Sequence, residues 1–160
     1  MKSAIFASAA LALAAFGLAA CGDEKAAEAD ASDATADGIA ISDARLILPA
    51  VAGNPGAVYF TIKNDGERDR FIRAASVDGA QSAVLHQMGT WNNQPSMDEV
   101  FQVPVKAGQE LKFEPGGLHV MANGLPETLA PGGTAQVTVT FVGGKTAAFP
   151  AARTSAGDER

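Results

Sequence analysis

The chain has 160 residues, 47% of them apolar, with 17 glycines, eight prolines and one cysteine. This length suits one domain with a real core and is too short for two, and a lone cysteine has no partner for an intramolecular disulfide. The formal net charge is −6, so the composition gives no indication of nucleic-acid binding.

Residues 1–20 have the pattern of a secretory signal peptide. Lys2 supplies a short positive start, and an alanine-rich apolar run follows it up to Ala20. The run is short for a membrane span and a polar segment comes next, so we favour a signal peptide over a permanent anchor helix.

The four residues that end this segment, Leu18-Ala19-Ala20-Cys21, resemble a bacterial lipobox. The resemblance implies cleavage before Cys21, lipidation of its thiol, and anchoring to a membrane in the bacterial periplasm. Acyl chains contribute about 0.8 kcal/mol per buried CH₂, so several chains would hold the protein firmly. The alternative is an ordinary signal peptide cut near Ala20 that leaves an incidental free thiol.

We expect residues 21–38 to be the lipidated cysteine followed by a disordered acidic tether. Residues 22–38 carry six acids and one lysine, with no aromatic or large aliphatic residue. Such a segment cannot bury enough apolar surface to offset its chain entropy. A metal-gathering role for the acids is the alternative, and a solvated spacer is favoured over it. Most of the net charge lies here, so the remaining chain is nearly neutral.

An all-β domain is predicted over residues 39–152, followed by a polar tail at 153–160. The strand candidates are rich in β-branched and aromatic residues and are separated by Gly, Pro, Asn and Asp turn signals. They cover 39–48, 57–64, 70–77, 82–88, 100–105, 110–113, 118–121, 134–142 and 145–151. Their number and spacing predict a Greek-key β-sandwich or barrel.

Both histidines and every internal methionine lie within residues 86–121. His86 and Met88 are two residues apart, as are His119 and Met121. On a strand, such neighbours point to the same face, so each pair could present one nitrogen and one sulfur side by side. These uncharged donors suit a soft monovalent ion such as Cu(I) better than a dication.

Met97 and Trp91 lie in the connection that follows the first pair. Met97 comes after a loop containing Gly, Asn and Pro that could fold back toward the two pairs. Trp91 could shield a bound ion through its ring face, although simple packing of the loop is favoured. A single methionine in a β protein is more often core filler than ligand. The joint placement of all these side chains is what favours a metal site.

The spacing within this stretch resembles the copper-binding signature of the periplasmic PCu(A)C copper chaperone family, formerly a domain of unknown function. The signature is His, ten residues, Met, twenty-one residues, His, one residue, Met, and it is met at His86, Met97, His119 and Met121. Other segments that match the family are AVYFTIKN at 57–64, DRF at 69–71, EPGGLHVMANGL at 114–125 and VTVTF at 137–141. The resemblance covers about residues 39–150.

This resemblance implies a cupredoxin-like β-barrel that binds one Cu(I) per chain near its surface. It implies His86, Met97, His119 and Met121 as the ligands, and Met88 is an accessory candidate. It also implies delivery of copper to the CuA centre of cytochrome c oxidase subunit II, beside a thioredoxin-like copper or thiol partner. The protein is then a metal carrier and not an enzyme.

The chain departs from the family pattern at a few positions. Pro95 stands where many members have a second methionine, and Ala122 replaces a leucine after the last ligand. The His/Met-rich C-terminal extension that some members use for a second copper has no counterpart in the SAGDER ending, which favours one copper per chain.

Several other functions compete with copper delivery. A blue-copper electron carrier needs a thiolate beside its histidines, and the only cysteine is Cys21, beyond the tether. A hydrolase or oxidoreductase is not supported, because both histidines are assigned to the metal and none remains to activate a nucleophile. The sequence also has no Gly-rich phosphate-binding motif before a helix. The serious rival is copper storage or detoxification at the same site. A more remote one is an envelope interaction lipoprotein that binds no metal.

Overall fold

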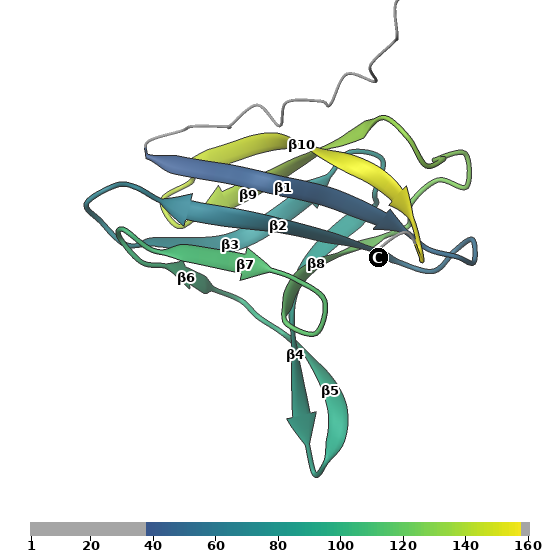
Figure 1. The fold of residues 1–160 in the computed structure, drawn as a ribbon, viewed down its shortest axis with the longest axis horizontal. Coiled ribbons are helices and arrows are strands. Elements are labelled where there is room, and N and C mark those ends of the chain that lie inside the picture. The colour runs from purple at the N-terminus through teal and green to yellow at the C-terminus, as the bar shows by residue number, and fades with distance from the viewer. Residues whose placement is uncertain (1–37, 158–160) are drawn as a thin grey trace, which may run out of the picture.

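The computed structural model describes residues 38–157, and the predicted signal peptide, Cys21 and residues 22–37 of the predicted tether lie outside that range. Within it the chain forms ten β-strands (Figure 1), and no helix there is long and apolar enough to cross a membrane. The strands are β1 Ile39–Leu48, β2 Gly56–Asn64, β3 Arg70–Val77, β4 Ser82–Trp91, β5 Gln94–Glu99, β6 Val103–Val105, β7 Glu110–Phe113, β8 Leu118–Asn123, β9 Thr134–Phe141 and β10 Thr146–Ser155. The all-β prediction is confirmed.

All ten strands belong to one sheet, in the order β5-β4-β8-β7-β2-β1-β10-β9-β3-β6, and β8 also pairs with β2. Neighbouring strands are antiparallel except for two parallel pairs, β1 with β10 and β7 with β8. The sheet curls until β3 approaches β4, so it encloses one core (Figure 1). The β4–β5 hairpin projects from the body of the domain.

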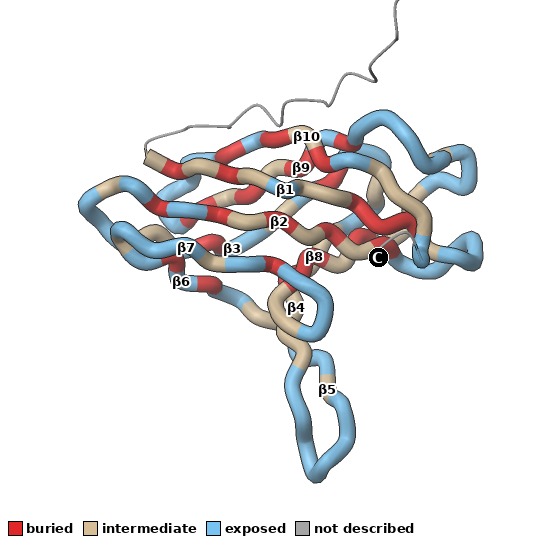
Figure 2. Tube along the Cα trace, in the orientation of Figure 1, coloured by how far each residue is buried: buried red, intermediate tan, exposed pale blue. Residues whose placement is uncertain are grey.

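Alternation of apolar residues explains how the central strands pack. In β2, Val58, Phe60 and Ile62 are buried and the residues between them are only partly covered. The ring of Phe60 stacks on Phe113 with centroids 4.2 Å apart and meets Phe149 at 5.0 Å. Burying each such side chain contributes about 1.5–3 kcal/mol. Figure 2 shows this burial along the central strands and an exposed β4–β5 hairpin.

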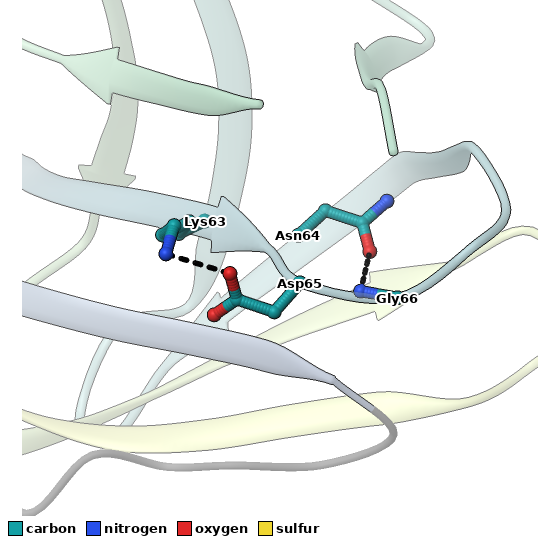
Figure 3. A network of polar contacts seen from close by, with 4 residues as sticks. All are labelled: Lys63, Asn64, Asp65 and Gly66. Carbon is teal, nitrogen blue, oxygen red and sulfur yellow. Dashed lines mark hydrogen bonds and ion pairs between the residues drawn. The ribbon is translucent and has the colours of Figure 1, made fainter. Parts of the chain in front are cut away.

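Asn64 at the end of β2 fixes the turn into β3 (Figure 3). It is fully buried, and its Nδ2 donates to the carbonyl oxygens of Arg68 at 2.8 Å and Val105 at 2.9 Å. Its Oδ1 accepts a hydrogen bond from the amide of Gly66 at 3.1 Å, which Figure 3 shows. Buried polar groups in folded proteins nearly always have hydrogen-bond partners, and the Nδ2 and Oδ1 of Asn64 both have theirs.

The neighbouring ion pair lies on the surface of the same turn (Figure 3). Lys63 Nζ is 2.6 Å from Asp65 Oδ1, and both side chains are half exposed. The hydrogen bond and the negative charge of Asp65 raise the pKa of Lys63 above its ordinary value of 10.5. Solvent screens such a pair, so it contributes little to stability.

The β4–β5 hairpin differs from the sequence prediction. β4 continues to Trp91, and Gln94–Glu99 forms a strand where a loop was expected. Asn92 and Asn93 have φ values of 50° and 59°, which make the two-residue left-handed turn that joins hairpin strands. Pro95 is tolerated because β5 is an edge strand.

The C-terminal strand also extends further than the sequence indicated. β10 continues to Ser155, so the first three residues of the predicted polar tail belong to a strand. Arg153, Thr154 and Ser155 pair in parallel with the last residues of β1. This pairing stabilises a segment whose own sequence lacks a strand pattern.

Candidate metal site

The two histidines meet across neighbouring strands. His86 on β4 lies directly opposite His119 on β8. Residues that face each other in an antiparallel pair project to the same side of the sheet. Their rings are accordingly close, with centroids 5.7 Å apart and planes at 85°. The pairing joins two strands that lie far apart in the sequence.

Core packing decides which face carries these rings. Leu85 and Val120, each next to a histidine, also face one another and are buried in the core. Alternation along the strands then places His86 and His119 on the outer face of the sheet. His119 is nevertheless only 6% exposed. An ion bound beside the two histidines on this face would therefore be partly shielded from water.

The hairpin brings Met97 back to the same face. Met97 on β5 lies directly opposite Met88 on β4, and Met88 follows His86 by two residues. All three side chains therefore share one face. Met97 is 46% exposed and Met88 is half-buried. The two thioethers lie at the open, hairpin side of the histidine pair.

Met121 lies on the other side of the histidine pair. It follows His119 by two residues on β8, so it shares that face, and it is partly buried. It pairs with Val84 of β4 on one side and Ala57 of β2 on the other. The register thus gathers the four predicted ligands and Met88 on one face.

Hydrogen bonds distinguish the two imidazoles. His119 Nδ1 lies 3.2 Å from the carbonyl oxygen of Gly117. The same oxygen accepts a hydrogen bond from the amide of Met88 at 3.1 Å. This one carbonyl connects the β8 histidine with the β4 strand. His86 Nδ1 is buried and has no hydrogen-bond partner among the described residues. A buried nitrogen without a partner is compatible with a metal-binding role.

Tyr59, which the sequence did not single out, lies beside His119, and Arg45 lies beside Tyr59. The ring of Tyr59 on β2 is 6.4 Å from the His119 ring, and the guanidinium of Arg45 lies 5.2 Å from the centroid of Tyr59. Arg45 and Tyr59 are directly paired across β1 and β2. Alternation in β2 could have placed Tyr59 on the outer face, but only the strand order shows that it neighbours β8.

Trp91 does not have either role that the sequence suggested. It follows Met88 by three residues, which places it on the opposite face of the hairpin. It is 74% exposed, so it does not pack against the domain either. The short Asn92–Asn93 turn leaves it at the hairpin tip. Both earlier interpretations of Trp91 are wrong.

The predicted ligands on this face are two imidazoles and three thioethers, all uncharged. Among residues 38–157 no group of three or more His, Cys, Asp or Glu side chains is arranged to hold a metal ion. Thioether sulfur is a soft ligand that favours Cu(I), and imidazole also binds copper. The face could therefore hold a soft monovalent ion.

Comparison with known proteins identifies the family of this domain. The model of the family described as "Putative lipoprotein LpqE-like" matches residues 39–152. The protein named "Putative lipoprotein Lxx21020" of Leifsonia xyli subsp. xyli is 33% identical over 114 residues. That match covers 69% of this chain and 66% of the relative, so the chain spans about two thirds of the relative's length.

Solved structures of PCuAC domains have a similar fold. The copper-bound PCuAC domain from PmoF2 has a TM-score of 0.61 at 17% identity, covering 74% of this chain and 93% of that domain. The Cu(I) form of DR1885 from Deinococcus radiodurans has a TM-score of 0.54 at 24% identity, covering 84% of this chain and 87% of that one. These likenesses confirm the expected cupredoxin-like fold. The chain belongs to the LpqE-like lipoprotein family, and its resemblance to the PCu(A)C family is confirmed.

Proposed function

We propose that this protein is an extracytoplasmic metallochaperone that binds one Cu(I) and passes it to another protein. The direct pairing of His86 with His119, flanked by methionines on both sides, is the observation that supports this most strongly. The copper-bound PCuAC relatives are consistent with it. In this role the protein carries its metal as cargo and catalyses no reaction.

The proposed ligands are the imidazoles of His86 and His119 and the thioethers of Met97 and Met121, with Met88 as an accessory. All are uncharged, which suits a monovalent ion. His119 is 6% exposed whereas Met97 is 46% exposed. One side of the proposed site is therefore open, and a partner's ligands can replace its thioethers without unfolding the domain.

We propose the bacterial periplasm as the location, with a membrane anchor at the lipidated Cys21. Membership of a lipoprotein family supports this proposal. By family resemblance, the acceptor is the CuA domain of cytochrome c oxidase subunit II. The same resemblance supports a thioredoxin-like partner that handles copper or the acceptor's thiols.

A titration with Cu(I) tests binding. The purified full chain is titrated without oxygen against a chromophoric Cu(I) chelator, and one equivalent should bind. The double variant His86→Gln/His119→Gln should lose this binding while keeping its β-sheet circular dichroism spectrum. Absence of binding by the unchanged chain would reject the copper proposal and would leave the non-metal envelope role.

A transfer experiment separates delivery from storage. The copper-loaded chain is mixed with an apo CuA domain, and the absorption of the assembled centre is followed. Delivery predicts that the centre forms at the expense of the bound copper. If copper stays on this protein and deletion of its gene makes cells sensitive to copper, storage or detoxification is the better assignment.

A further inference from the structure

The two histidines of the proposed site have unequal surroundings. His119 Nδ1 contacts the Gly117 carbonyl at 3.2 Å. His86 Nδ1 is buried without a hydrogen-bond partner among residues 38–157. A histidine that binds metal through one ring nitrogen usually donates its other N–H to a carbonyl or carboxylate. His119 already has this arrangement, and His86 has yet to acquire it.

The chemistry of neutral imidazole assigns the ring nitrogens. One nitrogen carries a proton and donates, and the other has a lone pair that can bind metal. A carbonyl oxygen only accepts, so His119 carries its proton on Nδ1 and offers Nε2 to the ion. A proton on the buried His86 Nδ1 would be a donor with no acceptor, which is unfavourable. His86 therefore offers Nδ1 and carries its proton on Nε2.

The carboxylate of Glu99 lies on the strand next to His86, where it can accept a hydrogen bond from the His86 Nε2–H. It lies directly opposite His86 across β4 and β5, on the face that carries Met88 and Met97. Side chains paired in this way have Cβ atoms about 4.5–5.5 Å apart, within reach of a carboxylate. Asp98, next to it, pairs with Gln87 and projects from the opposite face.

We propose that Glu99 is a positioning residue that accepts the His86 Nε2–H when His86 Nδ1 binds Cu(I). Gly117 serves the same purpose for His119, which binds through Nε2. The two imidazoles thus use different ring nitrogens. This inference rests on the proposed copper function and adds a residue to which the ligand pattern gives no role.

Matched substitutions at the two adjacent acids test the role of Glu99. Glu99→Ala should weaken Cu(I) binding about tenfold, the lower end of the range for outer-shell groups. Asp98→Ala removes an equal charge from the other face and should leave the affinity within about twofold of the unchanged chain, because Asp98 cannot reach His86. Glu99→Gln keeps an oxygen acceptor and should recover part of the loss. Equal effects of the two alanine variants, or no effect of either, would overturn the proposal.

Nitrogen NMR of the histidine rings gives the second measurement. The chain contains two histidines, so the ring spectrum holds two spin systems, and His86→Gln assigns them. On adding Cu(I), the Nδ1 signal of His86 and the Nε2 signal of His119 should shift. Binding of both rings through Nε2 would contradict the inference while leaving the copper function intact. If neither ring responds to Cu(I), the copper function itself fails.

Discussion

Met88 and Met97 lie directly opposite each other across the β4–β5 hairpin, on the face that carries His86. Met97 is a member of the signature spacing and Met88 is not, yet the fold gives their side chains adjoining places. The strand that brings them together, Gln94–Glu99, is largely exposed and lies at one edge of the sheet. Copper entering or leaving the proposed site should therefore pass this pair.

Leucine substitutions distinguish the two methionines. Met97→Leu removes a proposed ligand and should weaken Cu(I) binding at least about tenfold, since even outer-shell changes cost about 10- to 100-fold. Met88→Leu should keep the affinity within a few-fold and slow the transfer of copper to a competing chelator. Both changes nearly preserve volume, so apo stability should fall by less than about 1.5 kcal/mol. Equal affinities of the Met97 variant and the unchanged chain would remove Met97 from the ligand set.

Tyr59 should support His119 from the side away from β4. Tyr59→Leu removes the ring whose centroid lies 6.4 Å from that of the His119 ring and over which the Arg45 guanidinium lies. Loss of the aromatic and cation–π contacts should lower the free energy of unfolding by about 1–2 kcal/mol. Copper affinity should fall several-fold, because the His119 ring is less constrained. Thr61→Val, two residues along β2, is the control and should change neither quantity appreciably.

Asn64 should be among the most sensitive polar positions. Asn64→Ala leaves the carbonyls of Arg68 and Val105 and the amide of Gly66 without their side-chain partner. Because buried groups without partners are costly, the free energy of unfolding should fall by about 2–4 kcal/mol, as measured by urea denaturation. Asn54→Ala, at an exposed turn, is the control and should lie within about 0.5 kcal/mol of the unchanged chain. Comparable values for the two variants would contradict the role given to Asn64.

Gly56 should not accept a side chain. A Cβ at this position would lie 2.7 Å from Leu125 Cδ1 and 2.8 Å from the carbonyl oxygen of Ile47. The backbone oxygen cannot move without disturbing the pairing of β1 with β2, so Gly56→Ala should destabilise the domain by about 1–3 kcal/mol. Gly117→Ala is the control. A Cβ at this position would meet only atoms of Glu114, at 3.5 Å, and the carbonyl that His119 contacts is kept. The melting temperature and copper affinity of this variant should therefore stay near those of the unchanged chain.

Strands with clear alternation were predictable from the sequence. β3 has the predicted bounds, and β2 and β9 differ from theirs by one residue, because one face of each packs into the core. β5 was missed because its sequence, QPSMDE, is polar and stays largely exposed. Its pairing depends on a two-residue turn at Asn92 and Asn93 and on a partner strand already fixed by the core. The position of Trp91 was mispredicted because it depends on the same turn and the same strand pairing.

The sequence by itself determined the kinds of donor and their local arrangement, since residues two apart on a strand share a face. It could not determine that β4 and β8 are neighbours, or that His86 is opposite His119. That register follows from burial of Leu85 and Val120 in a common core. A slip of one residue would turn every side chain of the strand to the other face, so packing of the core settles where the histidines lie.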